Sequence, residues 1–107
     1  MTWTVTTLNA LVDTEVEALP ADMRARLTRL SEIIEEHGLD ALPRDAVDHL
    51  EDKLWELRIR SKSGISRAIY VTAAGQRVVI VRVFVKKTQK TPMQELRLAR
   101  KRAKDVQ

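Results

Sequence analysis

A change in hydrophobic period at residue 54 limits the fold more than any other feature of the sequence. Over residues 54–60 apolar and charged side chains alternate, and a period of two predicts a β-strand with one buried and one polar face. Turn-forming residues at 61–64 and 74–76 separate this strand from two further segments rich in β-branched residues, 65–73 and 77–86. Three strands joined by two short turns predict an antiparallel meander, so the fold must be built around a sheet.

The residues before the meander predict one strand and two helices. Residues 2–7 are β-branched and aromatic, which favours a short strand. Asn9 can cap a first helix, and Pro20 can open a second helix, in which apolar residues recur at helical spacing until Gly38 ends it. Residues 39–53 have no clear period, and we expect a loop there that can include a helical turn.

A basic helix is predicted after the meander. Thr91 as the N-cap, Pro92 at the first helical position and Gln94 at the third position form a capping box. The apolar stripe of the following residues is thin and most other positions are basic, so we expect this helix to be held weakly.

These elements place the chain in the α+β class. We expect the two N-terminal helices to pack on one face of a twisted antiparallel sheet of about four strands, with the basic C-terminal helix following the sheet. Three glycines and three prolines are spread over the 107 residues without a linker-like run or a repeat. Residues 1–107 are therefore predicted to form a single domain.

The charges are divided unevenly along the chain. Residues 1–56 carry 5 Lys and Arg against 13 Asp and Glu, a net charge of −8, whereas residues 57–107 carry 14 against 2, a net charge of +12. A strongly basic half favours a polyanionic partner such as nucleic acid. The same pattern is also compatible with acidic helices and basic strands that neutralise one another within the fold, so both interpretations stay open.

Composition argues against several classes of protein. The chain has no cysteine, which excludes a disulfide framework and a thiolate metal site. The two histidines, His37 and His49, lack the i, i+4 spacing of a helical zinc site, and we expect no metal and no cofactor. The longest apolar stretch falls far short of the roughly 20 residues of a membrane span, and the N-terminal residues do not resemble a secretory signal. We therefore expect a cytoplasmic protein without a membrane partner.

Basic residues on and beside the predicted meander are the candidate binding residues. Arg58 and Arg60 share the polar face of the first meander strand, and Arg67 lies on the neighbouring strand, so the three can line one patch. Lysines extend this region in the first turn and beyond the third strand: Lys62, Lys86, Lys87 and Lys90. Guanidinium groups bind phosphate bidentately and lysines act as compact point charges, which suits an RNA or DNA backbone. A solvated basic surface is the alternative.

Three strings carry a resemblance to a known family. They read Leu-Trp-Glu-Leu-Arg at 54–58, Gly-x-x-Arg-x-x-Tyr at 64–70 and Phe-Val-Lys-Lys-Thr-x-Lys-Thr-Pro at 84–92, and a basic helix follows them. In these features the chain resembles the RelE/HigB superfamily of toxins of type II toxin-antitoxin systems, most closely its phage-derived HigB-like subgroup.

The resemblance implies a RelE-like microbial RNase fold and a metal-independent, ribosome-dependent mRNA endoribonuclease that inhibits translation. In such enzymes the ribose 2′-OH attacks the adjacent phosphorus and leaves a 2′,3′-cyclic phosphate or a 3′-phosphate end. The implied partners are mRNA, the ribosome and a cognate helix-turn-helix antitoxin of the HigA type. We expect the antitoxin to contact the final helix.

The resemblance also implies roles for the basic residues. RNA would be bound by Arg58, Arg60, Lys62 and Lys86. Arg67 would stabilise the negative charge that develops on the phosphate oxygens, and Lys87 or Lys90 would transfer the protons.

The sequence departs from the family pattern at one point. Several relatives carry a tyrosine or a histidine near the start of the last helix, whereas residues 88–107 contain neither. Tyr70 is the one tyrosine, and strand alternation places it on the face opposite Arg67, where a core role is expected. Two other functions therefore stay open: a non-catalytic RNA- or ribosome-binding module on the same fold, and a basic module that binds an acidic protein.

Overall fold

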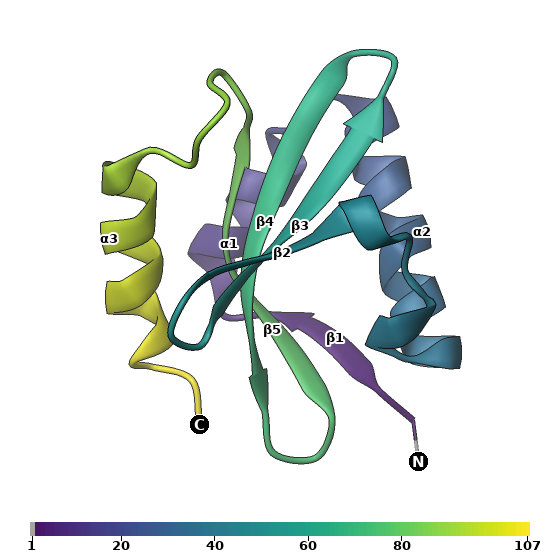
Figure 1. Ribbon diagram of the computed structural model, residues 1–107, viewed down its shortest axis with the longest axis vertical. Helices are drawn as coiled ribbons and strands as arrows, with labels where there is room; N and C mark the ends of the chain where they lie inside the picture. Colours follow the sequence, from purple (N-terminus) through teal and green to yellow (C-terminus); the bar gives the residue numbers. More distant parts are fainter. Residues whose placement is uncertain (1) are drawn as a thin grey trace.

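The computed structural model describes residues 2–107 and has the α+β architecture expected from the sequence (Figure 1). Its elements are β1 (Thr4–Thr7), α1 (Ala10–Glu17), α2 (Ala21–His37), the short 3-10 helices η1 (Leu39–Ala41) and η2 (Arg44–Ala46), β2 (Val47–Glu51), β3 (Leu54–Ser61), β4 (Gly64–Ala73), β5 (Arg77–Val85) and α3 (Met93–Ala103). The strands form one sheet in the order β1-β5-β4-β3-β2. The meander β3-β4-β5 is antiparallel as predicted, but β1 joins the edge of the sheet parallel to β5, so the sheet is mixed and not wholly antiparallel as expected.

The predicted cap of the first helix and the predicted end of the second helix are confirmed. The Asn9 side chain caps α1 by accepting a hydrogen bond from the backbone N–H of Val12 at 3.2 Å. Gly38 ends α2 with a φ of +89°, a conformation that favours glycine because other residues carry a Cβ atom.

The helical turn expected within residues 39–53 is present as η1 and η2, but the strand β2 replaces the expected loop at residues 47–51 and raises the number of strands from the expected four to five. This strand pairs with β3 in antiparallel register, with Val47 opposite Leu57 and His49 opposite Trp55. It lies at the edge of the sheet, and exposed or half-buried residues make up its whole length. An edge strand of this kind does not need the apolar alternation by which strands are recognised in a sequence.

Helices cover both faces of the sheet. The pair α1 and α2 packs on one face, and α3 lies on the other, at the left of Figure 1. Under α1 and α2 the sheet contributes a set of buried apolar side chains: Leu57, Ile59, Ala68, Tyr70, Val78, Ile80 and Val83. Under α3 it contributes a smaller set: Leu54, Ile69, Val71, Val79 and Val81. None of the helices in residues 2–107 is long and apolar enough to cross a membrane.

The predicted capping box of the final helix is wrong, although the helix itself begins close to the expected position. Pro92 is the N-cap of α3, and no side chain caps the helix there. The hydroxyl of Thr91 instead donates a hydrogen bond to Glu56 on β3, at 2.5 Å. Thr91 therefore joins the loop before α3 to the sheet rather than closing the first turn of the helix.

The expectation that α3 is held weakly considered only its thin apolar stripe, which ion pairs supplement in the structure. Glu95 accepts two hydrogen bonds from Arg82 on β5, at 2.8 and 3.1 Å. Arg102 pairs with Glu15 of α1 at 2.8 Å, and Glu15 also pairs with Arg82 at 2.9 Å. This network joins β5 to helices on opposite faces of the sheet. Charge pairing thus fixes α3 where apolar contacts are few.

Candidate functional site

The seven basic residues singled out in the sequence gather at one end of the sheet. Arg58 and Arg67 are direct cross-strand partners, and Arg60 lies two residues further along the same face of β3. Lys62 lies in the turn between β3 and β4. The lysines of the loop between β5 and α3 lie at the same end, because the backbone N–H of Lys86 donates to the carbonyl of Ile65 on β4 at 2.8 Å (Figure 1).

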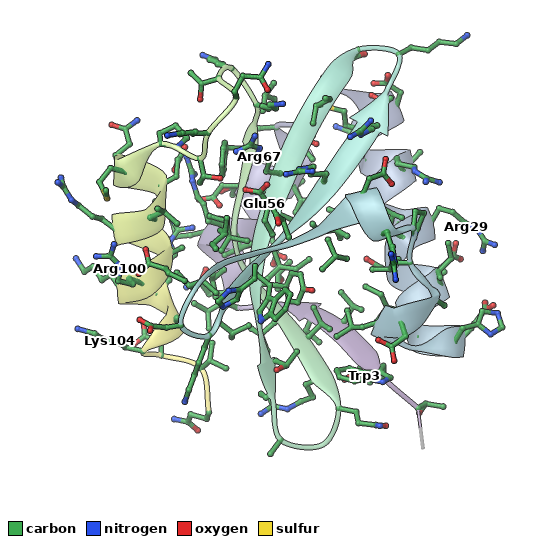
Figure 2. All side chains as sticks on the ribbon, viewed as in Figure 1. Trp3, Arg29, Glu56, Arg67, Arg100 and Lys104 are labelled. Atoms are coloured by element: carbon green, nitrogen blue, oxygen red, sulfur yellow. The ribbon has the colours of Figure 1, made fainter. Side chains whose placement is uncertain are left out.

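Arg67 is buried against the sheet rather than open to solvent. Its side chain is 2% exposed, and its Nε lies 3.4 Å from Oε1 of Glu56, whose side chain is 1% exposed. Figure 2 shows the two side chains next to each other on the face of the sheet that α3 covers. A buried pair of opposite charges requires further hydrogen bonds to offset the cost of removing both groups from water.

These further hydrogen bonds come from the loop before α3, residues 86–92. Nη1 of Arg67 donates to the Thr91 hydroxyl at 2.7 Å, and Nη2 donates to the Gln89 carbonyl at 2.7 Å. Arg67 therefore anchors the loop that carries Lys87 and Lys90. A phosphate can reach this guanidinium only when the contacts to the loop open, so in this conformation Arg67 positions other residues.

The other two arginines of the patch are also paired. Arg58 donates to Asp48 at 2.9 Å and lies 3.6 Å from Glu56, and Arg60 lies 3.6 Å from Asp45. Six arginines of the basic half form ion pairs with carboxylates: Arg58, Arg60, Arg67, Arg82, Arg100 and Arg102. Internal neutralisation, one of the two interpretations of the charge pattern, thus accounts for these arginines.

The lysines differ from the arginines in having no ionic partner. Within the part of the chain that the structure describes, no ion pair involves Lys62, Lys86, Lys87 or Lys90. Lys62, Lys87 and Lys90 are exposed, and Lys86 is half-buried. The uncompensated positive charge at this end of the sheet therefore belongs to four lysines. Such a cluster attracts anions, and the attraction is screened by salt.

Two shallow grooves flank the lysine-bearing loop, and Lys87 lines both. One groove, of about 420 Å³, lies between Gly64 and Ile65 of β4 and the start of the loop. The other, of about 370 Å³, is lined by Phe84 and Gln94 among others. In such a groove the Lys87 ammonium can contact a phosphate, the Phe84 ring can contact the face of a base, and the Gln94 amide can hydrogen-bond to the polar edge of a base.

The predicted core role of Tyr70 is confirmed. Its side chain is buried in the cluster beneath α1 and α2, on the face opposite Arg67. Burial raises the pKa of its hydroxyl to about 12. His37 ends α2, and His49 lies on β2 against the Trp55 ring, with 4.7 Å between the ring centroids. No group of three or more histidines and carboxylates suited to a metal ion occurs among residues 2–107.

The sequence interpretation missed Glu56 and Thr91, which organise the site. Glu56 accepts the Thr91 hydrogen bond and lies within 3.6 Å of a nitrogen of Arg58 and of Arg67. The signal for Glu56 was present, because it shares the polar face of β3 with Arg58 and a carboxylate on a basic strand face suggests a pair. The role of Thr91 had no such signal, because its residue type fitted an N-cap equally well.

A protein-family model matches most of the chain. The family described as "Phage derived protein Gp49-like (DUF891)" matches residues 14–104. The matched region runs from within α1 to the end of α3 and includes all seven basic residues of the candidate site. No curated protein matches the sequence.

Proposed function

The chain belongs to the phage-derived Gp49-like family, a RelE/HigB-like toxin family, and from this premise we propose that it is the toxin of a type II toxin-antitoxin system that cleaves mRNA on the ribosome. The observation that carries the proposal is a group of four lysines without an ion-pair partner among the described residues, three of them on the loop that the buried Arg67 anchors. Phosphate contacts dominate the affinity of proteins for nucleic acids, and lysines without internal partners are free to make them.

In this proposal the RNA backbone lies along Arg58, Arg60, Lys62 and Lys86. The 2′ oxygen of one ribose attacks the adjacent phosphorus, the new O2′–P bond forms and the P–O5′ bond breaks. A base takes the proton of the 2′-OH and an acid protonates the leaving 5′ oxygen, and Lys87 and Lys90 are the groups that we assign to these transfers. Arg67 stabilises the charge on the phosphate oxygens once the loop opens and exposes it.

Three partners follow from this function. The mRNA is the substrate, and the ribosome holds it in the geometry that the reaction requires. A cognate helix-turn-helix antitoxin, encoded beside the toxin, neutralises the toxin in the cytoplasm. We place the antitoxin contact on the outer face of α3, where Arg97, Lys101 and Lys104 have no ion-pair partner among the described residues. We expect the toxin to lose affinity for the antitoxin when these three residues are replaced by acidic residues. Unchanged affinity would contradict the placement.

Controlled expression in bacteria tests the function. We expect the wild-type protein to arrest growth and the Lys87→Ala, Lys90→Ala double variant to lose most of the effect. Lys53→Ala is the matched control, because Lys53 is an exposed lysine in the β2–β3 turn and lies outside both grooves. The assignment of the two lysines is wrong if the double variant and the control are equally toxic.

A non-catalytic RNA- or ribosome-binding protein is the second candidate. It is favoured by the burial of Tyr70 on the far face of the sheet and by the positions of His37 and His49 outside both grooves. This candidate predicts growth arrest with intact messages. Cleaved messages whose appearance depends on Lys87 and Lys90 would exclude it.

A further inference from the structure

A row of three side chains crosses the sheet beside the lysine-bearing loop, and it includes an aromatic ring that the proposed mechanism does not use. Arg58 on β3 is the cross-strand partner of Arg67 on β4, and Arg67 is in turn the partner of Phe84 on β5. Directly paired residues place their side chains on the same face of a sheet, with Cβ atoms about 5 Å apart. Phe84 therefore lies next to the arginine that we assign to the phosphate oxygens.

The groove between β5 and α3 brings this ring together with an amide and an ammonium group. Phe84 is half-buried and lines the groove, which has a volume of about 370 Å³. Lys87 of the loop and Gln94 of the first turn of α3 line it too, and both are exposed. Proteins bind single-stranded RNA by stacking bases on aromatic rings and by hydrogen bonds to base edges. The three side chains therefore match the parts of one nucleotide.

The other charged groups of the groove neutralise one another. The guanidinium of Arg82 lies over the Phe84 ring, 5.8 Å from its centroid. Ion pairs with Glu15 and Glu95, at 2.9 and 2.8 Å, hold Arg82 in this position. Of the charged residues that line the groove, Lys87 alone has no ionic partner among residues 2–107. The groove thus attracts an anion, and its one carboxylate is paired and repels a phosphate little.

We propose that this groove holds one base of single-stranded RNA and that Gln94 determines which base is preferred. The base stacks on Phe84, its edge forms hydrogen bonds with the Gln94 amide, and Lys87 contacts the adjoining phosphate. An amide offers an acceptor and two donors in fixed positions, so it matches the edges of different bases unequally. The subsite rests on the proposed function, because RNA is the ligand in both, but it does not require that the RNA be cleaved.

Binding of oligonucleotides that cannot be cleaved tests the subsite separately from catalysis. The probes are fluorescein-labelled heptamers of 2′-O-methyl adenosine, cytidine or uridine, whose methylated 2′ oxygen cannot attack phosphorus, and an abasic heptamer with the same phosphates. Fluorescence anisotropy at low salt, without ribosomes, should show tighter binding of the base-bearing heptamers than of the abasic one. The best of the three bases should exceed the worst about tenfold. Equal affinity for the three bases would overturn the role of Gln94, and equal affinity for all four probes, or no binding, would overturn the subsite.

Matched variants assign the two roles. Phe84→Leu keeps an apolar side chain on β5 but removes the ring, so it should weaken the base-bearing heptamers about tenfold and leave the abasic one unchanged. Gln94→Ala should remove the preference among the three bases. Met93→Ala is the control, because Met93 is 57% exposed on the same turn of α3 and does not line the groove. A preference that survives Gln94→Ala, or that Met93→Ala also removes, would contradict the assignment, and so would weaker binding of the abasic heptamer to Phe84→Leu.

Discussion

At the scale of single residues, the carboxylate of Glu56 allows two arginines to lie directly opposite each other. Arg58 and Arg67 are cross-strand partners, and like charges at such positions repel. Glu56 lies within 3.6 Å of a nitrogen of each guanidinium and accepts a hydrogen bond from the hydroxyl of Thr91. The basic face of the sheet therefore depends on one buried acid, which also sets the position of the loop before α3.

Replacing Glu56 by glutamine should destabilise the protein strongly. The substitution leaves Arg67 buried without a counter-charge, and breaking a buried pair from one side costs about 3–5 kcal/mol. Urea denaturation should show a loss of that size in the free energy of unfolding. Glu17→Gln, on an exposed position of α1, should change it by less than about 0.5 kcal/mol. Equal effects of the two substitutions would show that the Glu56 network is not structural.

Asp22 should make stability dependent on acid pH. Its carboxylate accepts hydrogen bonds from the hydroxyl and backbone N–H of Ser63, both at 2.8 Å, and these bonds lower the pKa of Asp22 from 3.8 to about 2. The folded state thus binds the proton less readily than the unfolded chain does. The stabilisation is present above pH 3.8 and is lost as the pH falls toward 2.

The measurement is the pH dependence of unfolding between pH 5 and pH 2, compared with that of Asp22→Asn. The wild-type protein should lose more stability across this interval than the variant, because asparagine does not titrate. Asp22 joins the start of α2 to the β3–β4 turn that carries Lys62, so the bond also fixes one lysine-bearing segment. Parallel pH profiles for the two proteins would contradict this role.

Much of the fold at this scale follows from single residue types. Asn9 and Gly38 mark helix boundaries because their side chains, or the lack of one, satisfy local geometric requirements. The burial of Arg67 does not follow in this way. Arg67, Glu56 and Thr91 are far apart in the sequence and form their contacts only once the chain has folded. The alternation of residues along a strand does not indicate which residue of a distant loop a side chain will contact.

At the scale of elements, α3 is held on the sheet by charge pairs that extend around the edge of β5. Hydrogen bonding to Glu95 raises the pKa of Arg82, and the negative charges of Glu15 and Glu95 raise it further. Glu15 also accepts a hydrogen bond from the backbone N–H of Val83 at 3.1 Å, and Arg102 donates a hydrogen bond to the Val81 carbonyl at 2.9 Å. β1 pairs only with residues 77–80 of β5, so the rest of that edge of β5 has no neighbouring strand. There the side chains of Glu15 and Arg102 form hydrogen bonds with backbone groups of β5, which protects this part of the edge from pairing with another chain.

Neutralising Glu15 should loosen α3 selectively. Glu15→Gln removes the charge that Arg82 and Arg102 share, and leaves both cations partly buried at a cost of about 2–3 kcal/mol. Hydrogen exchange should accelerate in Met93–Ala103 more than in Ala21–His37. Glu32→Gln, which removes only an exposed pair with Arg29, is the control. Uniform acceleration of both helices would indicate general destabilisation instead.

The element order could be predicted except where an element is polar or its end is determined by tertiary contacts. The meander and the first two helices have apolar periods strong enough to identify them. The strand β2 was not predicted because it lies at the edge of the sheet and is polar. The cap of α3 was predicted wrongly because the Thr91 side chain forms a hydrogen bond with β3 instead of with its own helix. The attachment of α3 depends on Glu15, 80 residues from Glu95, so no local pattern could indicate it.

At the scale of the whole molecule, the two interpretations of the charge pattern apply to different residues. Six of the eight arginines in the basic half are neutralised within the fold, whereas the lysines of the turn and the loop have no ionic partner in the described chain. The lysine-bearing end of the sheet is therefore the surface that attracts a polyanion.

The most direct test of the account is to map RNA ends in a purified translation reaction programmed with a single mRNA. The account predicts new upstream fragments that end in a 2′,3′-cyclic phosphate or a 3′-phosphate, and only while ribosomes translate. Their yield should fall roughly 10²-fold or more in the Lys87→Ala, Lys90→Ala variant and stay unchanged in Lys53→Ala. An intact message in the presence of ribosome-bound wild-type protein would contradict the account.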